Sequence, residues 1–335
     1  MVILRGNGEN VMPVCVTGGA GFLGSEICKK LSNERILHTI YDRKYPRFKS
    51  KYTNYVQGDI RDLERLISAT KQHQVVIHLA AEWNDVGVTD HEYNTTNIDG
   101  TKNIADAAES NNIKSIIFAS STSVYKFEDD NYNAYRENDV AEDPPGIYGK
   151  TKAAGEDILR SWQSKSKSKN LKIIRPSVIY GPYNRGNVFN LIKQIKSRFF
   201  ILPRKYDVVK SIAYVGNVAN FFIYLLMKET SDTVYNYCDN PSLNTYELVQ
   251  KINQLFSHKT TLINVNPKIL IKMSSLLDYF PGKIKNKFGS MKVKKFLRPT
   301  YLSNELAFKT GFNQPVNTED GLKETVEWII QNGNR

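Results

Sequence analysis

Cysteines and long apolar runs are scarce in this sequence. The three cysteines, Cys15, Cys28 and Cys238, have no metal-ligand spacing and are odd in number, so they cannot all pair. We therefore expect reduced cysteines and no metal site. No run approaches the ~18 consecutive apolar residues of a membrane span, and Met1–Met12 lacks the apolar core of a signal peptide. These absences predict a protein that stays in the cytoplasm.

Acidic residues are scarce in one segment. The chain carries a net charge of +12, and nine Lys or Arg lie between Lys268 and Arg298 against a single acid, Asp278. No recognised nucleic-acid module surrounds this segment, so we expect no nucleic-acid partner. The alternatives are a phosphate-bearing ligand, an anionic membrane surface or a solvated face. The apolar stretch Ile269–Phe280 is favoured as a core helix, with a membrane-docking helix as the alternative.

What remains is the composition of a globular protein with alternating strand and helix patterns. With 335 residues, 41% of them hydrophobic, the chain is long enough for one large domain or two smaller ones. The alternation predicts an α/β fold with a doubly wound parallel sheet, whose chemistry lies at the carboxyl ends of the strands. The predicted strands are Val14–Thr17, Ile36–Tyr41, Tyr55–Gln57, Val75–Leu79, Ile116–Ser120 and Lys172–Arg175, and the predicted helices include Leu63–Lys71, Thr95–Asn111 and Tyr148–Ser161.

A glycine turn follows the first strand. Gly18, Gly21 and Gly24 precede a helical pattern that runs to Leu31, which is typical of a loop that holds a pyrophosphate at a helix start. The second strand ends in Asp42, 24 residues after Gly18, where a carboxylate binds the adenosine ribose and repels a 2′-phosphate. The pattern predicts dinucleotide binding and favours NAD over NADP, although the neighbouring Arg43 weakens that preference.

A tyrosine and a lysine lie four residues apart in the last of these helices. Tyr148 and Lys152 would share one helix face, about one turn apart. An ammonium beside a phenol favours the phenolate, which makes the tyrosine a general base. The spacing alone is a weak signal, because many surface helices contain it.

Six motifs in order resemble a known family. They resemble the extended short-chain dehydrogenase/reductase family, in its NAD-dependent epimerase/dehydratase branch of nucleotide-sugar enzymes, and the resemblance covers Pro13–Asn332. The motifs are Thr17–Gly24, His78–Ala81, Asn97–Thr101, Ser120–Tyr125, Tyr148–Lys152 and Arg175–Pro182. The resemblance implies a Rossmann-type sheet with a smaller C-terminal substrate-binding lobe. We expect the NAD-binding domain over 12–183, rejoined by about 211–240, and the lobe over 184–210 and 241–335.

The resemblance also implies roles for individual residues. Tyr148 is expected to be the catalytic base, Lys152 to bind the nicotinamide ribose and lower the Tyr148 pKa, and Ser121 to share the proton of the substrate hydroxyl. Tightly bound NAD is expected to contact Gly18, Gly21, Phe22, Leu23, Gly24, Asp42, Asp59, Ile60, Leu79, Ala80, Ala81, Asn97, Tyr148 and Lys152. A homodimer through the helices Thr95–Asn111 and Tyr148–Ser161 is also expected from the family.

Departures from the family pattern narrow the activity. Thr122 and Ser123 stand where 4,6-dehydratases carry an Asp-Glu pair, which excludes that elimination, and Lys210 replaces the arginine that binds the nucleotide diphosphate. A closer resemblance is to bacterial O-antigen 4-epimerases that act on a polyprenyl-diphosphate-linked sugar. The matching stretches are Ala81–Val86, Asn184–Leu191, Lys210–Asn217, Val234–Pro241 and Val293–Phe296, and the substrate-binding residues they imply are Ser121, Thr122, Asn187, Val188 and Lys210.

These features predict an NAD-dependent sugar 4-epimerase of cell-surface polysaccharide synthesis. It would act through a 4-keto intermediate on a diphosphate-linked N-acetylhexosamine, linked to polyprenol or to UDP, with peripheral contact to the cytoplasmic face of the inner membrane through 268–298. One alternative is an NAD(P)H-dependent 4-ketoreductase of a UDP-4-keto-6-deoxy-N-acetylhexosamine. Another is a non-catalytic dinucleotide-binding regulator. Asp42 favours the epimerase, and the joint presence of Ser121, Tyr148 and Lys152 disfavours the regulator.

Overall fold

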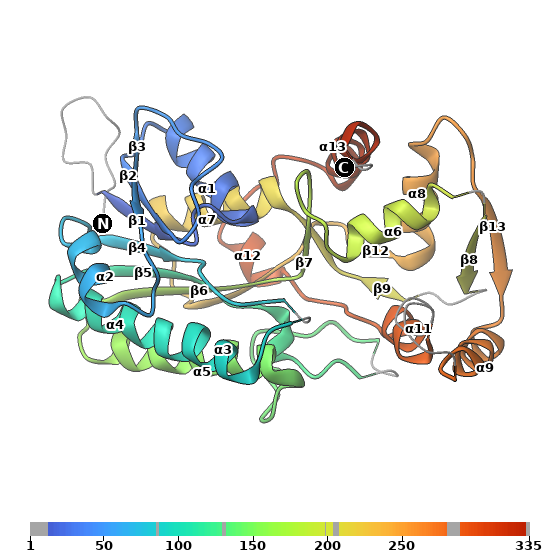
Figure 1. The fold of residues 1–335 in the computed structure, drawn as a ribbon, viewed down its shortest axis with the longest axis horizontal. Helices are drawn as coiled ribbons and strands as arrows, with labels where there is room; N and C mark the ends of the chain where they lie inside the picture. Colours follow the sequence, from blue (N-terminus) through green and yellow to red (C-terminus); the bar gives the residue numbers. More distant parts are fainter. Residues whose placement is uncertain are drawn as a thin grey trace.

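The central element is a parallel sheet of seven strands. The computed structural model describes residues 13–84, 87–128, 132–197, 199–203, 208–279 and 289–332, so Met1–Met12 and part of the basic segment lie outside the described residues. The strand order is β11-β6-β5-β4-β1-β2-β3, and all pairs are parallel (Figure 1). The strands are β1 (Val14–Thr17), β2 (His38–Asp42), β3 (Thr53–Gln57), β4 (Val75–His78), β5 (Ser115–Ala119), β6 (Asn170–Pro176) and β11 (Val234–Tyr237).

This topology confirms the predicted doubly wound fold. β1 and β4 read as continuous apolar runs because every residue in them is buried, as expected for strands covered on both faces. The chain passes from β1 outward to β3 and then returns to β4 on the other side of β1. Ligands of such sheets bind beyond the carboxyl ends of the strands at this reversal.

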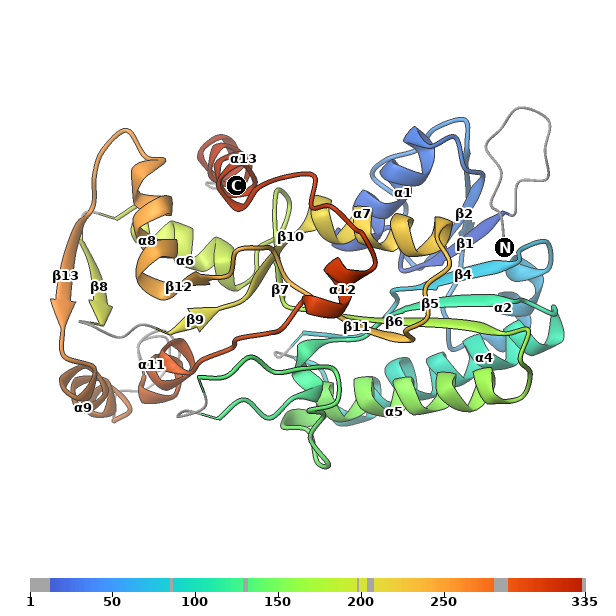
Figure 2. The ribbon, with the colours of Figure 1, turned by 180° about the vertical axis from the view of Figure 1, so that it is seen from behind.

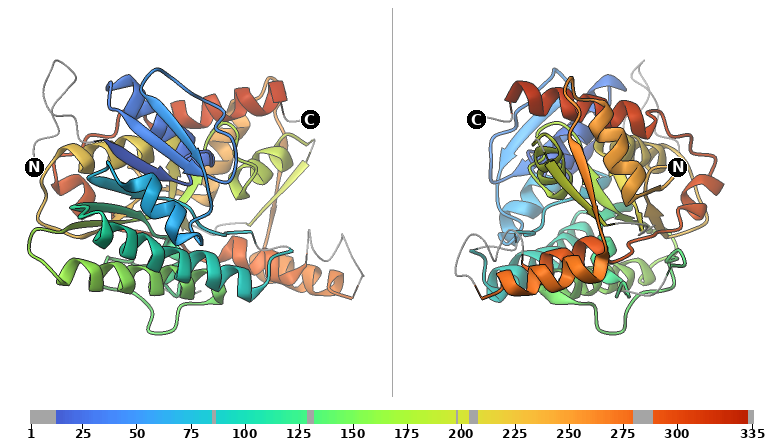
Figure 3. Two further views of the ribbon diagram at one scale, coloured as in Figure 1. Left: turned by 60° about the vertical axis from the view of Figure 1, so that its left-hand side comes forward. Right: turned by 90° about the vertical axis from the view of Figure 1, so that its right-hand side faces the viewer.

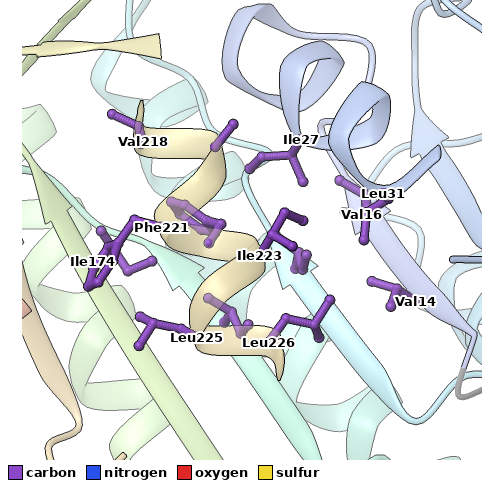
Figure 4. Packing of buried hydrophobic residues seen from close by; sticks show 14 of the residues in the cluster. Val14, Val16, Ile27, Leu31, Ile174, Val218, Phe221, Ile223, Leu225 and Leu226 are labelled. Atoms are coloured by element: carbon purple, nitrogen blue, oxygen red, sulfur yellow. The ribbon is translucent and has the colours of Figure 1, made fainter. Parts of the chain in front are cut away.

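Helices cover both faces of the sheet. One face is covered by α1 (Phe22–Asn33) and α7 (Val215–Met227), which pack against each other, and the other by α2 (Leu63–Thr70), α4 (Gly100–Ser110) and α5 (Gly146–Ser164) (Figures 1 and 2). Figure 4 shows α7 pressing its apolar side chains between α1 and the strands. The two layers place the first turn of α5 beside the carboxyl ends of the central strands.

The predicted helix Thr95–Asn111 is interrupted at its start. α3 (Asp90–Tyr93) leads into a π-helical turn, η1 (Asn94–Asp99), before α4 begins at Gly100. A π-helical turn widens the helix by one residue and is frequent at functional sites. Here it carries Asn97, one of the residues predicted to contact the cofactor.

The remaining elements form a second core beside the sheet. Three small pairs belong to it: β7 (Val178–Tyr180) with β10 (Ile212–Tyr214), β8 (Phe199–Pro203) with β13 (Thr261–Val265), and β9 (Val209–Lys210) with β12 (Leu243–Asn244). The helices α6 (Asn187–Ile195), α8 (Thr245–Gln254) and α13 (Thr318–Asn332) contribute to this core, and α9 (Pro267–Leu277) and α11 (Ser290–Leu297) pack against each other at its outside. The short helix α12 (Glu305–Lys309) packs instead against β11, in the core shared with α1 and α7. Figure 3 shows this lobe from two further sides.

The structure differs from two expectations about the lobe region. The stretch Ser211–Asn217 was expected to return to the sheet, but β10 pairs with β7 outside it, and the chain rejoins the sheet through α7 and β11. α9 is not a core helix, because Ser274 is its one buried residue. The boundaries given to the two domains stay predictions. No helix among the described residues is long and apolar enough to cross a membrane.

Removing the ring of Phe221 tests the α7 core. Phe221 is fully buried on α7 and contacts the rings of Tyr235, Tyr237 and Phe312. We expect Phe221→Ala to lower the free energy of unfolding by about 3–5 kcal/mol in urea titrations, because the cavity cannot close. The exposed control Leu37→Ala should change it by less than about 0.5 kcal/mol. Equal effects of the two substitutions would contradict this account of the core.

Candidate active site

The glycine turn packs against the end of β4 without room for side chains. Gly18 has φ +72°, and a Cβ there would lie 2.6 Å from the Ala80 nitrogen. A Cβ on Gly24 would lie 2.2 Å from the Gly18 oxygen, inside any tolerable contact. The turn thus brings backbone from β1, α1 and the segment after β4 into contact. Phe22 and Leu23 form the first turn of α1, next to Gly21 at its N-cap. This cradle fits a dinucleotide pyrophosphate.

The residues predicted for the adenosine half gather at the ends of β2 and β3. Asp42 ends β2, and its carboxylate accepts hydrogen bonds from the backbone N–H groups of Ala20 (2.9 Å) and Lys44 (2.9 Å). The Asp59 carboxylate accepts hydrogen bonds from the Arg61 guanidinium, and an Arg43 nitrogen lies 3.9 Å from it. Burial raises the pKa of Asp59, but the hydrogen bonds from Arg61 outweigh it and lower the pKa. The Asp59 carboxylate therefore stays charged.

Asn97 ties the segment after β4 to the helix that carries Tyr148. Its Oδ1 accepts a hydrogen bond from the Glu82 N–H (2.7 Å), and its Nδ2 donates to the Glu82 oxygen (3.0 Å) and to the Thr151 hydroxyl (3.0 Å). The segment Leu79–Ala81 lies directly before Glu82, and the Leu79 N–H donates to Thr17 on β1. Both ends of the Asn97 amide are therefore engaged within the protein, and they fix the path along which the dinucleotide was predicted to run.

Ser121 and Tyr148 meet at the carboxyl end of β5, and Lys152 lies one turn further along α5. α5 begins just before Tyr148, and the hydroxyl of this partly exposed residue interacts with the Ser121 side chain in the loop after β5. Burial raises the pKa of Tyr148 to about 12, and the hydrogen bond with Ser121 opposes this rise. The direction is opposite to the lowering that the sequence predicted.

The surroundings of Lys152 account for the difference between the predicted and the observed direction of the Tyr148 pKa. The Lys152 Nζ is buried and lies 4.2 Å from the centroid of the Phe118 ring, and burial lowers the Lys152 pKa to about 7 against an opposing effect of Glu156. His78 stacks on the same ring and stays neutral, since burial and Lys152 lower its pKa to about 3. The contacts of Lys152 are therefore with Phe118 and Glu156. In the protein alone, burial determines the direction in which the Tyr148 pKa is shifted.

Sequence reasoning missed a buried ion pair one turn beyond Lys152. The Arg175 guanidinium on β6 donates to both oxygens of the Glu156 carboxylate, at 2.8 Å and 2.5 Å. Ser120 (2.5 Å) and Arg160 (2.7 Å) donate to the same carboxylate, and Arg175 also donates to the Tyr125 hydroxyl (2.9 Å). Burial raises the pKa of Glu156, but Arg175 outweighs it and lowers the pKa. The four-residue spacing of Lys152 and Glu156 on α5 was the only signal in the sequence.

The predicted substrate residues divide between the sheet edge and the lobe. Ser121 caps the short helix η2 (Thr122–Val124) and accepts a hydrogen bond from the Ser123 N–H (3.1 Å), so Thr122 lies beside the catalytic candidates. Asn187 and Val188 begin α6 in the lobe, where Asn187 is exposed and Val188 is buried in the lobe core.

Lys210 lies in the lobe at the end of β9. Its Nζ donates to the backbone oxygens of Lys295 (3.2 Å) and Arg298 at the carboxyl end of α11. Burial lowers the pKa of Lys210 to about 8, with further lowering by the charges of Arg298 and Lys295. Three cations therefore cluster at this point, and the charges of Lys295 and Arg298 oppose protonation of Lys210.

A separate groove of about 670 Å³ lies on the lobe side of the molecule. Its lining includes none of the predicted catalytic or substrate residues, although it passes beside Val209, the neighbour of Lys210. The residues that line it include Asn133, Arg136, Val209, Asn240, Ser242, Tyr301 and Asn304. We assign the groove no part in the site at the sheet edge.

The doubly wound sheet with a glycine turn at its first strand defines a dinucleotide-binding protein of the α/β class. Residues 14–238 match the NAD dependent epimerase/dehydratase family, and the chain belongs to this family of NAD-dependent enzymes. It is 33% identical over 321 residues, 94% of each chain, to the N-acetyl-alpha-D-glucosaminyl-diphospho-ditrans,octacis-undecaprenol 4-epimerase of Escherichia coli O157:H7. It is 32% identical, over 61% of its length and 63% of the relative, to a 3 beta-hydroxysteroid dehydrogenase/Delta 5-->4-isomerase of Monkeypox virus.

Solved structures share the fold at lower identity. The UDP-glucose 4-epimerase of Thermus thermophilus, in complex with NAD, superimposes with a TM-score of 0.74 at 22% identity, over 96% of this chain and 100% of that one. The UDP-N-acetylglucosamine 4-epimerase of Bacillus cereus gives a TM-score of 0.73 at 23% identity, over 96% and 97%. These likenesses establish the fold.

Filling the glycine turn should weaken the hold on NAD. We expect Gly24→Ala to release NAD, because its Cβ would lie 2.2 Å from the Gly18 oxygen and displace the turn. Gly21→Ala is the graded control, because its Cβ would lie 3.1 Å from the same oxygen. The measurement is the amount of dinucleotide released per protein chain after denaturation. Full retention of NAD in Gly24→Ala would contradict the assignment of the cradle.

Neutralising Glu156 should destabilise the fold. Glu156→Gln leaves the buried Arg175 guanidinium without its charged partner, and breaking such pairs costs about 3–5 kcal/mol of unfolding free energy. Asp157→Asn is the matched control, because Asp157 is the next residue on α5, is exposed and pairs only with Arg160 at 3.0 Å among the described residues. Urea unfolding measures both variants, and equal stabilities would rule out a structural role for the pair.

Proposed function

We propose that this protein is an NAD-dependent sugar 4-epimerase that acts through a 4-keto intermediate on a diphosphate-linked N-acetylhexosamine. The observation that carries the proposal is the interaction of Ser121 with the Tyr148 hydroxyl, with Lys152 one turn further along α5 and no carboxylate at positions 122 and 123. A tyrosine and a serine can remove and return a hydroxyl proton. An elimination of water needs a further acid, which the side chains of η2 do not supply.

The cofactor is assigned to the turn and to the strand ends. Gly18, Gly21 and Gly24 would face the pyrophosphate, Asp42 the adenosine ribose, and Lys152 the nicotinamide ribose. Asp42 can accept hydrogen bonds from a ribose diol with the same carboxylate that binds Ala20, and its charge disfavours a 2′-phosphate. When bound, NAD would supply a reversible acceptor for the C4 hydride.

The protein's part in the chemistry is proton transfer and orientation. Tyr148 takes the proton of the C4 hydroxyl when C4 becomes a ketone, and gives it back to the C4 oxygen after the sugar has turned its other face. Ser121 interacts with the Tyr148 hydroxyl and shares this proton. With a Tyr148 pKa of about 12 in the protein alone, the base needs added positive charge beside it in the working complex. Lys152, one turn further along α5, is the residue that we assign to supply this charge.

The cations of the lobe support a diphosphate in the substrate. Lys210 lies with Lys295 and Arg298, and their positive charge adds to burial in lowering the Lys210 pKa. A diphosphate is complementary in charge to such a cluster of cations. The Escherichia coli relative is named for a sugar that is linked through diphosphate to undecaprenol, which supports a lipid-linked substrate over a UDP-linked one. Synthesis of a cell-surface polysaccharide such as O-antigen, at the cytoplasmic face of the inner membrane, follows as the proposed role.

A substrate comparison tests this function. The purified protein is given N-acetylglucosamine linked to polyprenyl diphosphate, or linked to UDP, and formation of N-acetylgalactosamine is measured after acid release. We expect conversion of the lipid-linked sugar with no net consumption of added NADH. Conversion of neither sugar would contradict the 4-epimerase. Stoichiometric consumption of NAD(P)H with a UDP-4-keto sugar would establish the ketoreductase instead. Conversion of the UDP-linked sugar alone would contradict a lipid-linked substrate.

Removing the Tyr148 hydroxyl tests the assigned base. We expect Tyr148→Phe to lower turnover by about a hundredfold to ten-thousandfold, because proton transfer contributes on the order of 10²–10⁴ to the rate. Bound NAD should stay at the level of the unmodified protein. Tyr246→Phe is the control, because Tyr246 is an exposed residue of α8 whose hydroxyl contacts Gln250. Retained activity in Tyr148→Phe would disprove the mechanism.

A further inference from the structure

The outward face of α9 is apolar and exposed. Ile269, Met273 and Leu276 follow one another at spacings of four and three residues, which places them on one helix face, and they are 54%, 55% and 61% exposed. A helix at the surface of a globular protein normally turns polar residues outward. Lys268 and Lys272 flank these side chains and are also exposed. α9 thus presents an apolar stripe edged by lysines to its surroundings.

The stripe is part of a larger apolar tip of the lobe. α9 packs against α11, whose Met291 is 81% exposed, and Tyr279 at the end of α9 is 87% exposed. Figures 1 and 2 show α9 at the end of the lobe, away from the seven-stranded sheet. Among the described residues, eight of the seventeen exposed large apolar side chains lie at this end: Phe199, Ile201, Ile263, Ile269, Met273, Leu276, Tyr279 and Met291. Such concentration marks an interaction surface.

Basic residues outnumber acidic ones at this end. The sequences of β8, β13, α9 and α11 contain no acidic residue, and the segment from Lys268 to Arg298 has six basic residues among those that the structure describes. Its single acid, Asp278, accepts hydrogen bonds from the Ser290 N–H (3.0 Å) and hydroxyl (2.5 Å), so it helps to fasten α11 to α9. Apolar side chains that alternate with lysines complement a surface with anionic headgroups over hydrocarbon.

We propose that the α9–α11 tip docks on an anionic lipid bilayer, with Ile269, Met273, Leu276, Tyr279 and Met291 entering the interface and Lys268 and Lys272 contacting headgroups. The proposal rests on the proposed function for its purpose, because a polyprenyl-linked sugar must be reached while its chain remains in the bilayer. Lys210 connects the two sites, since its Nζ holds the carboxyl end of α11 by the oxygens of Lys295 and Arg298. A diphosphate at these cations would therefore lie next to the docked helices.

Vesicle co-sedimentation of the full chain tests the docking surface without any substrate. We expect binding to phosphatidylcholine vesicles that contain phosphatidylglycerol, weaker binding at high salt, and little binding to phosphatidylcholine alone. The triple variant Ile269→Ser, Met273→Ser, Leu276→Ser should bind at least about tenfold more weakly, because insertion of apolar side chains is lost. Lys268→Gln with Lys272→Gln should weaken binding by about fivefold for each lysine at low salt.

A matched control separates this surface from apolar exposure in general. Leu37→Ser with Ile330→Ser removes two side chains that are each 50% exposed but lie on other parts of the molecule, and binding should not change. Unchanged vesicle binding in the triple variant, or no binding by the unmodified protein, would overturn the proposal. A change from dimer to monomer in the triple variant, with no change in vesicle binding, would identify the occupant as a second copy of this chain and equally overturn it.

An activity arm distinguishes failure of docking from failure of the proposed function. The triple variant should epimerise a water-soluble short-prenyl diphosphate sugar at the rate of the unmodified protein. It should convert the same sugar on a long polyprenol in phosphatidylglycerol vesicles at least about tenfold more slowly. Equal rates on both substrates would count against docking alone. Loss of all conversion by the unmodified protein would count against the 4-epimerase and leave the vesicle result to decide the surface.

Discussion

The Glu156 carboxylate fixes the position of the helix that carries Tyr148 and Lys152. It joins α5 to β6 through Arg175 and to the end of β5 through Ser120, so a single buried group sets the helix against two strands. Lys152 lies one turn earlier on α5 and depends on the same charge, since Glu156 raises a pKa that burial lowers. The ion pair is worth little as net stability, because both charges leave water. Its value lies in the one orientation of α5 that it permits.

The hydrogen bonds of Asn97 hold α5 on the other side of the site. Asn97 holds Glu82 and Thr151 together, and its place in a π-helical turn lets its side chain reach both. Thr151 lies between Tyr148 and Lys152, so α5 is anchored from the sheet and from the helix layer within a single turn. Catalytic groups on rigid elements with supported side chains keep their geometry better than groups on loops. The site candidates therefore sit on a part of α5 that is anchored from two sides.

The sequence predicted the doubly wound parallel sheet because the alternation of strands and helices follows from local patterns. Buried parallel strands read as short apolar runs, and glycines mark the turn after β1, where Gly18 approaches Ala80. The pairing of Arg175 with Glu156 could not be predicted, because the two residues are 19 positions apart and meet only through the fold. The π-helical turn was not predicted for a different reason. One extra residue in a turn leaves the apolar spacing of a helix almost unchanged. The lowering of the Tyr148 pKa by Lys152 stays a prediction, because helical spacing says nothing about burial, which raises this pKa in the protein alone.

Lys210 connects the cluster of cations in the lobe to the position of α11. Its ammonium closes the carboxyl end of α11, and its charge state is sensitive to Lys295 and Arg298 at the same helix end. An anion bound to this cluster would favour the charged form of Lys210 and strengthen its hydrogen bonds to α11. A restraint on α11 would in turn keep the three cations together and favour anion binding. Thermodynamic reciprocity requires the two effects to be equal in free energy. A single lysine would thus couple anion binding at these cations to the position of α11.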